Sequence, residues 1–136
     1  MIRYQVGNDL DIDAVIELYE ASTLGERRPI DNRDRMSRMI HNANLVITAW
    51  DADLLIGISR AISDFSYATY LSDLAVRKSY QNQGIGKELI RRTQLESGAE
   101  TKIILLSAPA AEKYYPKIGF THHPQAWLLN PGELIL

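Results

Sequence analysis

Two glycines past the middle of the chain have the spacing of an anion-binding turn. Gly84 and Gly86 follow the polar loop 79–83 and stand where an apolar, helix-like pattern begins. Because glycine has no Cβ, a ligand can approach the backbone there closely. The N–H groups of a first helical turn have no partner inside the helix and together carry about half a positive charge. We therefore expect this turn to hold a phosphate or a pyrophosphate.

The glycine pair alone is a weak signal, and its surroundings decide what it binds. It is not a Walker motif, because Lys87 after the second glycine is followed by Glu88 instead of Ser or Thr. It is not a dinucleotide fingerprint either, because it has no third glycine and does not follow the first strand of the chain. Lys87 either adds a cation to the turn or is simply solvated.

The composition is that of a globular protein. The 136 residues are 46% hydrophobic and 24% charged, and we expect one domain over residues 1–136. With 15 Lys and Arg against 17 Asp and Glu, the net charge is −2, so we expect no nucleic-acid partner. No apolar run reaches the ~20 residues of a membrane span, and no signal peptide is recognisable. We therefore expect a cytoplasmic protein that makes no contact with membranes.

No residue pattern predicts a metal site. The chain has no cysteine, which excludes disulfides, thiolate ligands and cysteine nucleophiles. His122 and His123 are adjacent, and adjacent residues of an extended strand point to opposite faces, so the pair is a poor metal ligand set.

Hydrophobic periodicity predicts a mixed α/β sheet that begins with an antiparallel meander. We expect helices around Ile12–Tyr19, Arg33–His41, Gly84–Glu96 and Ala110–Ile118. We expect strands at Ile2–Val6, Leu45–Trp50, Leu54–Ile62, Tyr67–Val76, Lys102–Ser107 and Gln125–Leu129.

Two motifs resemble the GCN5-related N-acetyltransferase (GNAT) family. Gln81-x-x-Gly84-x-Gly86 matches its Gln/Arg-x-x-Gly-x-Gly/Ala signature after a fourth strand, and the segment 114–120, Tyr-Tyr-Pro-Lys-Ile-Gly-Phe, matches an element after the fifth. The resemblance implies a mixed, mostly antiparallel sheet that splays between strands 4 and 5, flanked by about four helices. It also implies direct transfer of an acetyl group from acetyl-CoA to a primary amine of a small molecule or peptide, with no metal.

The resemblance assigns the cofactor contacts mainly to the main chain. Strand 4 of the family has a β-bulge, where the N–H of Ala75 or Val76 is the expected donor to the oxyanion. Lys87 is included as a candidate cation. The expected main-chain contacts to pantetheine and to pyrophosphate are those of Leu74, Ala75 and Val76 and of Gln81, Asn82, Gln83, Gly84, Ile85 and Gly86.

Two side chains are the candidate catalysts. Tyr115 corresponds to the family tyrosine that protonates the leaving sulfur; a phenol pKa of ~10 and a thiol pKa of ~8.5 permit this transfer. The other reading makes Tyr115 a half-buried core aromatic, and Pro116 is expected to kink or end the helix beside it. Asp73 is the candidate base or water anchor; in the other reading it pairs with Arg60 or another cation.

The sequence leaves three candidate functions open. Besides the acetyltransferase, a non-catalytic acyl-CoA-binding module and a nucleotide-dependent phosphotransferase would both use the glycine turn. Arg27 or Arg28 either binds an acceptor carboxylate or belongs to a solvated loop. A terminal hairpin is cramped after Phe120, so we expect a second subunit to complete the sheet in a homodimer.

Overall fold

The computed structural model describes all residues from Met1 to Leu136, and they form two compact units, Met1–Leu106 and Ser107–Leu136. The expectation of a single domain stays a prediction. The first unit contains the whole sheet and three helices. Its elements are β1 (Ile2–Val6), α1 (Ile12–Ser22), α2 (Arg33–Asn42), β2 (Leu45–Asp51), β3 (Leu54–Ser63), β4 (Ala68–Val76), α3 (Ile85–Ser97) and β5 (Lys102–Ile104).

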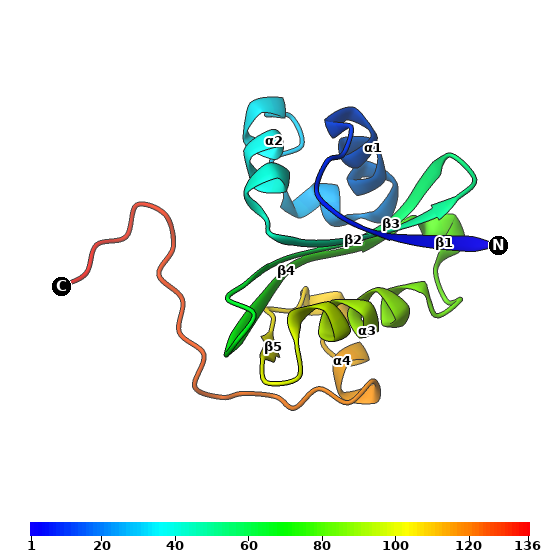
Figure 1. Ribbon diagram of the computed structural model, residues 1–136. Coiled ribbons are helices and arrows are strands. Elements are labelled where there is room, and N and C mark those ends of the chain that lie inside the picture. The colour runs from blue at the N-terminus through cyan, green and yellow to red at the C-terminus, as the bar shows by residue number, and fades with distance from the viewer. The chain divides into compact units, whose positions relative to one another are not determined.

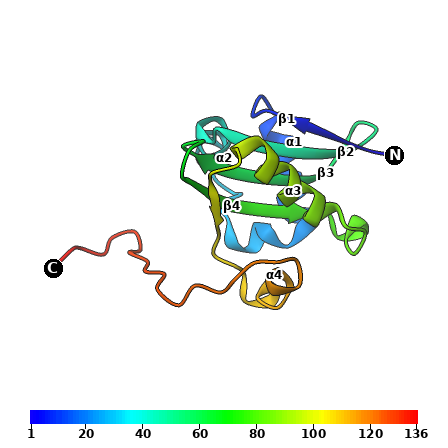
Figure 2. The same cartoon turned by 60° about the horizontal axis from the view of Figure 1, so that its bottom comes forward.

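The sheet has the expected mixed topology. Its strands lie in the order β1-β2-β3-β4-β5, antiparallel up to β4, and β5 is parallel to β4. α1 and α2 cover one face of the sheet and α3 covers the other, as Figures 1 and 2 show. None of the helices combines the length and the hydrophobicity that crossing a bilayer requires.

The core lies mainly between the sheet and the first two helices. Val15 and Leu18 of α1 and Met36 of α2 are fully buried against the apolar side chains of the sheet, such as Ile58. Their spacing follows the helical period that the sequence predicts. The helices therefore form because one stripe of each is apolar.

Pairing along β4 changes near its middle. Arg60 of β3 lies opposite Asp73, but the next residue, Ala61, lies opposite Leu71, so Ser72 is an extra, bulged residue. On the other edge, β5 pairs only as far as Tyr70. The expected bulge and splay are thus confirmed, but the bulge comes before the residues Ala75 and Val76 where it was expected. The rest of β4 has a free edge.

The second unit is less regular than expected. The helix predicted over 110–118 is divided into a 3₁₀ turn, Pro109–Ala111, and α4, Tyr114–Lys117. Pro116 does not end α4, because it lies in the first turn, where the missing N–H costs no helical bond.

Two expected strands are corrected. The strand predicted at Gln125–Leu129 is wrong, because these residues are exposed and have no neighbouring strand to pair with. The strand predicted at Lys102–Ser107 ends at Ile104, opposite the last β4 residue that pairs with it.

Gly57 lets the start of α3 pack closely on β3. A Cβ at this position would lie 3.0 Å from Leu89 Cδ1 and 3.3 Å from the Ala75 carbonyl oxygen. We therefore expect Gly57→Val to lower the free energy of unfolding by about 1–3 kcal/mol through overpacking. Urea denaturation measures the change, with the exposed Leu54→Val on the same strand as control. Equal stability of the two variants would contradict this packing.

Candidate active site

The free edge of β4 presents main-chain groups of alternate residues. The Arg77 N–H donates to the Ile56 carbonyl at 2.8 Å, which fixes the phase of the β3–β4 ladder. Because hydrogen-bonded and non-hydrogen-bonded pairs alternate, Leu74 and Val76 direct their N–H and C=O groups to the open edge. Ala75 directs its own toward β3. The expectation for Ala75 as a main-chain contact or oxyanion donor is therefore corrected, and Val76 is left.

The turn after β4 leads into α3 through two residues with positive φ. Asn82 has φ 64° and Gly84 has φ 82°, a conformation that glycine adopts without strain. Gly84 is the N-cap of α3 and its first turn has no side-chain cap. The successive N–H groups from Asn82 to Lys87 donate to no protein acceptor. This turn has the free donors that the sequence predicts for an anion site.

Side chains anchor both ends of this turn. Arg77 donates to the Leu55 carbonyl at 2.8 Å and forms an ion pair with Glu17 of α1 at 2.6 Å. Tyr80 donates to Asp51 at 2.5 Å, and Gln81 Nε2 donates to the Val76 carbonyl at 2.9 Å. The contact with Gln81 occupies the Val76 carbonyl and leaves the Val76 N–H free. The turn is therefore held by the β2–β3 hairpin, by α1 and by β4.

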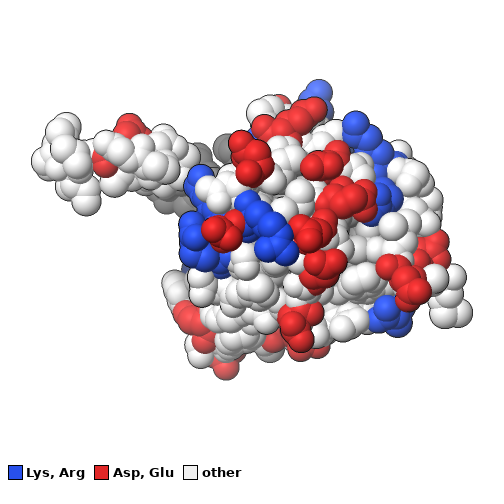
Figure 3. Space-filling view, turned by 90° about the horizontal axis from the view of Figure 1, so that it is seen from above, with Lys and Arg blue, Asp and Glu red and all other residues white.

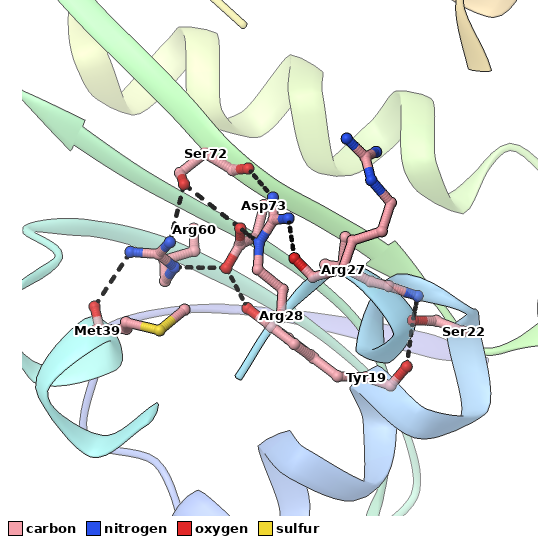
Figure 4. Close-up of polar contacts among 9 residues, drawn as sticks. Tyr19, Ser22, Arg27, Arg28, Met39, Arg60, Ser72 and Asp73 are labelled. Carbon is pink, nitrogen blue, oxygen red and sulfur yellow. Dashed lines mark hydrogen bonds and ion pairs between the residues drawn. The ribbon is translucent and has the colours of Figure 1, made fainter. Parts of the chain in front are cut away.

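Asp73 lies at the centre of a buried polar cluster on the α1–α2 side of β4 (Figure 4). Its Oδ1 accepts from Arg28 Nε, and its Oδ2 accepts from Arg60 Nε and the Tyr19 hydroxyl, all at 2.6 Å. Both carboxylate oxygens are thus used by the protein. Of the two readings of Asp73, the structure has the ion pair with Arg60.

The surroundings of Asp73 make it a weak base. Burial raises its pKa, but the hydrogen bond and charge of Arg60, with Tyr19 and Arg28, outweigh burial and lower the pKa below the usual value. A base near neutral pH needs a raised carboxyl pKa and access to its substrate. Asp73 is only 1% exposed, so the arrangement argues against proton abstraction from an acceptor amine.

The same two arginines hold the bulged residue. Arg28 Nη2 donates to the Ser72 carbonyl and Arg60 Nη2 donates to the Ser72 hydroxyl, both at 2.8 Å. A bulged residue loses its ladder partners, so these contacts replace them. Sequence reasoning missed this role of Arg28, for which it considered only an acceptor carboxylate or solvent. No local signal could have found it, because Arg28 and Ser72 lie far apart in the sequence.

Arg27 differs from its neighbour. Its side chain is exposed and points away from the Asp73 cluster (Figure 4). Its carbonyl accepts a hydrogen bond from Arg28 Nη1 at 2.8 Å, which ties the loop to the cluster.

The face formed by α1 and α2 carries charges of both signs. Asp13 of α1 and Arg33 of α2 form an exposed ion pair at 2.9 Å, and acidic and basic side chains are interspersed over this face (Figure 3). Several acidic side chains lie near one another across the middle of this face, with basic side chains gathered beside them.

Tyr115 belongs to the second unit, where α4 holds it between two aromatic rings. Its ring centroid lies 5.3 Å from that of Tyr114 and 5.5 Å from that of Phe120, both edge-to-face. Its carbonyl accepts the Phe120 N–H at 3.0 Å across Gly119, which has φ 106°. Burial, with a smaller effect of Tyr114, raises the pKa of Tyr115, so the phenol stays protonated at neutral pH. Its approach to the β4 edge stays a prediction.

Known proteins share the sequence pattern and the fold. A family model described as an acetyltransferase (GNAT) domain matches residues 20–127. A curated relative from Prochlorococcus marinus, an uncharacterized N-acetyltransferase ycf52-like protein, is 30% identical over 106 residues, 73% of this chain and 57% of the relative. This chain thus spans little more than half of that relative.

Two solved structures extend the likeness to nearly the whole chain. A probable acetyltransferase of unknown function from meticillin-resistant Staphylococcus aureus has a TM-score of 0.76 and 25% identity, covering 96% of this chain and 98% of the other. A predicted acetyltransferase from Clostridium acetobutylicum, solved with acetyl-CoA, has a TM-score of 0.75 and 17% identity, covering 96% of both chains. The second likeness concerns the fold alone.

Neutralising Asp73 should destabilise the fold. Asp73→Asn leaves the charges of Arg28 and Arg60 without a counter-ion, which we expect to cost about 3–5 kcal/mol of unfolding free energy at pH 7. Because the folded pKa of Asp73 lies below the unfolded value of ~3.9, its contribution is complete above that value. It is lost as the pH falls through the folded pKa.

Urea denaturation at a series of pH values measures this difference between the wild type and the variant. The control is Asp13→Asn, which breaks the exposed pair with Arg33 and should change stability little. A difference between wild type and Asp73→Asn that persists undiminished at the lowest pH would contradict the ion-pair account.

Proposed function

Because the chain belongs to the GNAT acetyltransferase family, we propose that it transfers the acetyl group of acetyl-CoA directly to a primary amine of a small molecule or peptide. One observation carries this proposal: β4 has a free edge, and the turn at the end of the same strand leads into the uncapped N-terminus of α3. A thioester carrier with an extended amide arm and a pyrophosphate needs both kinds of donor.

The binding step uses main-chain groups. Leu74 offers its outward N–H and C=O groups to the amides of the pantetheine arm, as a strand adds to a sheet edge. The Val76 carbonyl already accepts from Gln81 Nε2, so Val76 contributes its outward N–H alone. The N–H groups from Asn82 to Lys87 donate to the pyrophosphate, helped by the helix dipole. The solved relative from C. acetobutylicum, obtained with acetyl-CoA, supports the choice of ligand.

The chemical step needs an oxyanion donor and a proton donor. The amine attacks the thioester carbonyl, and the Val76 N–H stabilises the tetrahedral oxyanion. When the carbon–sulfur bond breaks, Tyr115 gives its proton to the thiolate. The raised pKa of Tyr115 keeps that proton available. Asp73 acts as a positioning residue that holds the β4 bulge, and water takes the proton from the amine.

Acetyl-CoA binding separates the proposal from its rivals. Isothermal titration should show acetyl-CoA binding in the range of about 1–100 µM, with ATP–Mg²⁺ binding at least about tenfold more weakly. Gly86→Val should abolish acetyl-CoA binding, because a side chain in the first turn of α3 obstructs the approach to its N–H groups. Gln94→Val, exposed on the same helix, is the control. Tighter binding of ATP–Mg²⁺ would favour the phosphotransferase.

Tyr115→Phe separates an enzyme from a binding module. We expect the variant to keep its affinity for acetyl-CoA and to lose about 10²–10⁴-fold in kcat, the usual contribution of a positioned acid. Release of free thiol with a panel of amines measures kcat, and Tyr114→Phe is the matched control. Turnover equal to that of wild type would remove Tyr115 from the reaction. A wild-type protein that binds acetyl-CoA but acetylates no amine of the panel would favour the binding module.

A further inference from the structure

Arg77 is the residue at which the chain leaves β4 for the donor turn, the stretch Asn82–Lys87 whose N–H groups donate to no protein acceptor. The Arg77 N–H still donates to β3, and its carbonyl accepts from the Tyr80 N–H at 2.8 Å, which closes the 3₁₀ turn Lys78–Tyr80. The donor turn begins two residues later. The placement of Arg77 and Tyr80 therefore decides where its N–H groups point.

Glu17 of α1 holds the Arg77 guanidinium with both of its carboxylate oxygens. Arg77 Nη1 donates to Glu17 Oε2 at 2.7 Å, and Arg77 Nη2 donates to Glu17 Oε1 at 2.6 Å. A bidentate pair of this kind fixes the plane of the guanidinium as well as its position. The Arg77 side chain is only 13% exposed, and its Nε is buried and donates to no protein atom. Glu17 is therefore the counter-ion of a largely buried cation at the entrance to the donor turn.

Asp51 holds the other end of the 3₁₀ turn. It is the last residue of β2, where the β2–β3 hairpin begins, and its Oδ2 accepts from the Tyr80 hydroxyl at 2.5 Å. Carboxylates from two separate elements, α1 and β2, thus fix two residues that lie three positions apart in one short turn.

Both carboxylates lie beside a turn whose free donors suit an anion. By charge alone, Glu17 and Asp51 would repel a pyrophosphate bound there. A carboxylate also has no proton to donate to a phosphate oxygen. Neither residue can favour the ligand directly, so any favourable effect has to pass through the side chain that each one holds.

We propose that Glu17 and Asp51 are positioning residues for the cofactor, which hold Arg77 and Tyr80 so that the N–H groups of the donor turn converge on the pyrophosphate of CoA before it binds. Donors that are already ordered bind more tightly, because less conformational freedom is lost on binding. The inference rests on the proposed function, since it takes CoA as the ligand.

Alanine substitution separates positioning from charge by the direction of the change. Glu17→Ala and Asp51→Ala should each weaken CoA binding by about 2–10-fold in isothermal titration, because a side chain of the turn then has to be ordered on binding. Charge repulsion alone predicts tighter binding by the same variants. The matched controls are Glu20→Ala on α1 and Asp53→Ala after β2, which remove exposed carboxylates that hold no residue of the turn. They should bind CoA at least as tightly as wild type.

Tyr80→Phe tests the Asp51 contact without changing the charge. It should weaken CoA binding about as much as Asp51→Ala, and the double variant should bind no more weakly than either single variant, because both substitutions remove the same hydrogen bond.

Kinetics distinguish positioning from a general loss of structure. Glu17→Ala should raise the KM for acetyl-CoA and leave kcat at saturating acetyl-CoA unchanged, because the donor turn lies away from the thioester. Its melting temperature should change little, because Glu17 is 54% exposed and exposed ion pairs add little stability.

The outcomes separate this inference from the proposed function. Wild-type affinity in Glu17→Ala and Asp51→Ala, tighter binding by them, or an equal loss of affinity in the controls overturns the positioning role alone. A fall in kcat with an unchanged KM for acetyl-CoA overturns it as well. Wild type that binds no CoA overturns the proposed function and this inference together.

Discussion

Asp73 is the charged group around which the β4 side of the site is built. A carboxylate this deeply buried requires paired charge, and here Arg28 and Arg60 supply it while Tyr19 donates a further hydrogen bond. The two guanidinium groups also reach the carbonyl and the hydroxyl of Ser72. One ion cluster thus joins the loop after α1, the middle of β3 and the bulge of β4.

The bulge in turn sets what β4 presents. Before the bulge, β4 pairs with β5 as far as Tyr70. After the bulge, the edge of β4 is free, and Leu74 and Val76 direct their main-chain N–H and C=O groups away from β3. The strand then runs into a turn that Arg77, Tyr80 and Gln81 hold in place. Ligand recognition therefore depends mainly on the main chain, which explains why few side chains of the site carry a recognisable signature.

The sequence predicts the parts of this site whose signals are local. The order of the elements follows from hydrophobic periodicity, and the glycine turn at the start of α3 follows from Gly84 and Gly86. The aromatic contacts of Tyr115 also lie within a short segment.

The rest depends on contacts that no local pattern encodes. The Arg28–Asp73 pair joins residues 45 positions apart, and the phase of the β4 ladder, which removes Ala75 from the open edge, depends on where the bulge falls. The strand expected at Gln125–Leu129 has residues typical of a strand, but these residues have no neighbouring strand. It does not form, because a strand is stable only when it is paired. Sequence reasoning could recognise its apolar pattern without knowing what covers it.

Amide chemical shifts during a titration with CoA test the central claim most directly, because they report on main-chain donors one by one. The account predicts that the largest ¹H–¹⁵N shifts fall on Val76 and on Gly84 through Lys87, at the open edge of β4 and the start of α3. If those amides stayed unchanged while CoA bound and shifted another part of the chain, the main-chain donors would not be the cofactor site.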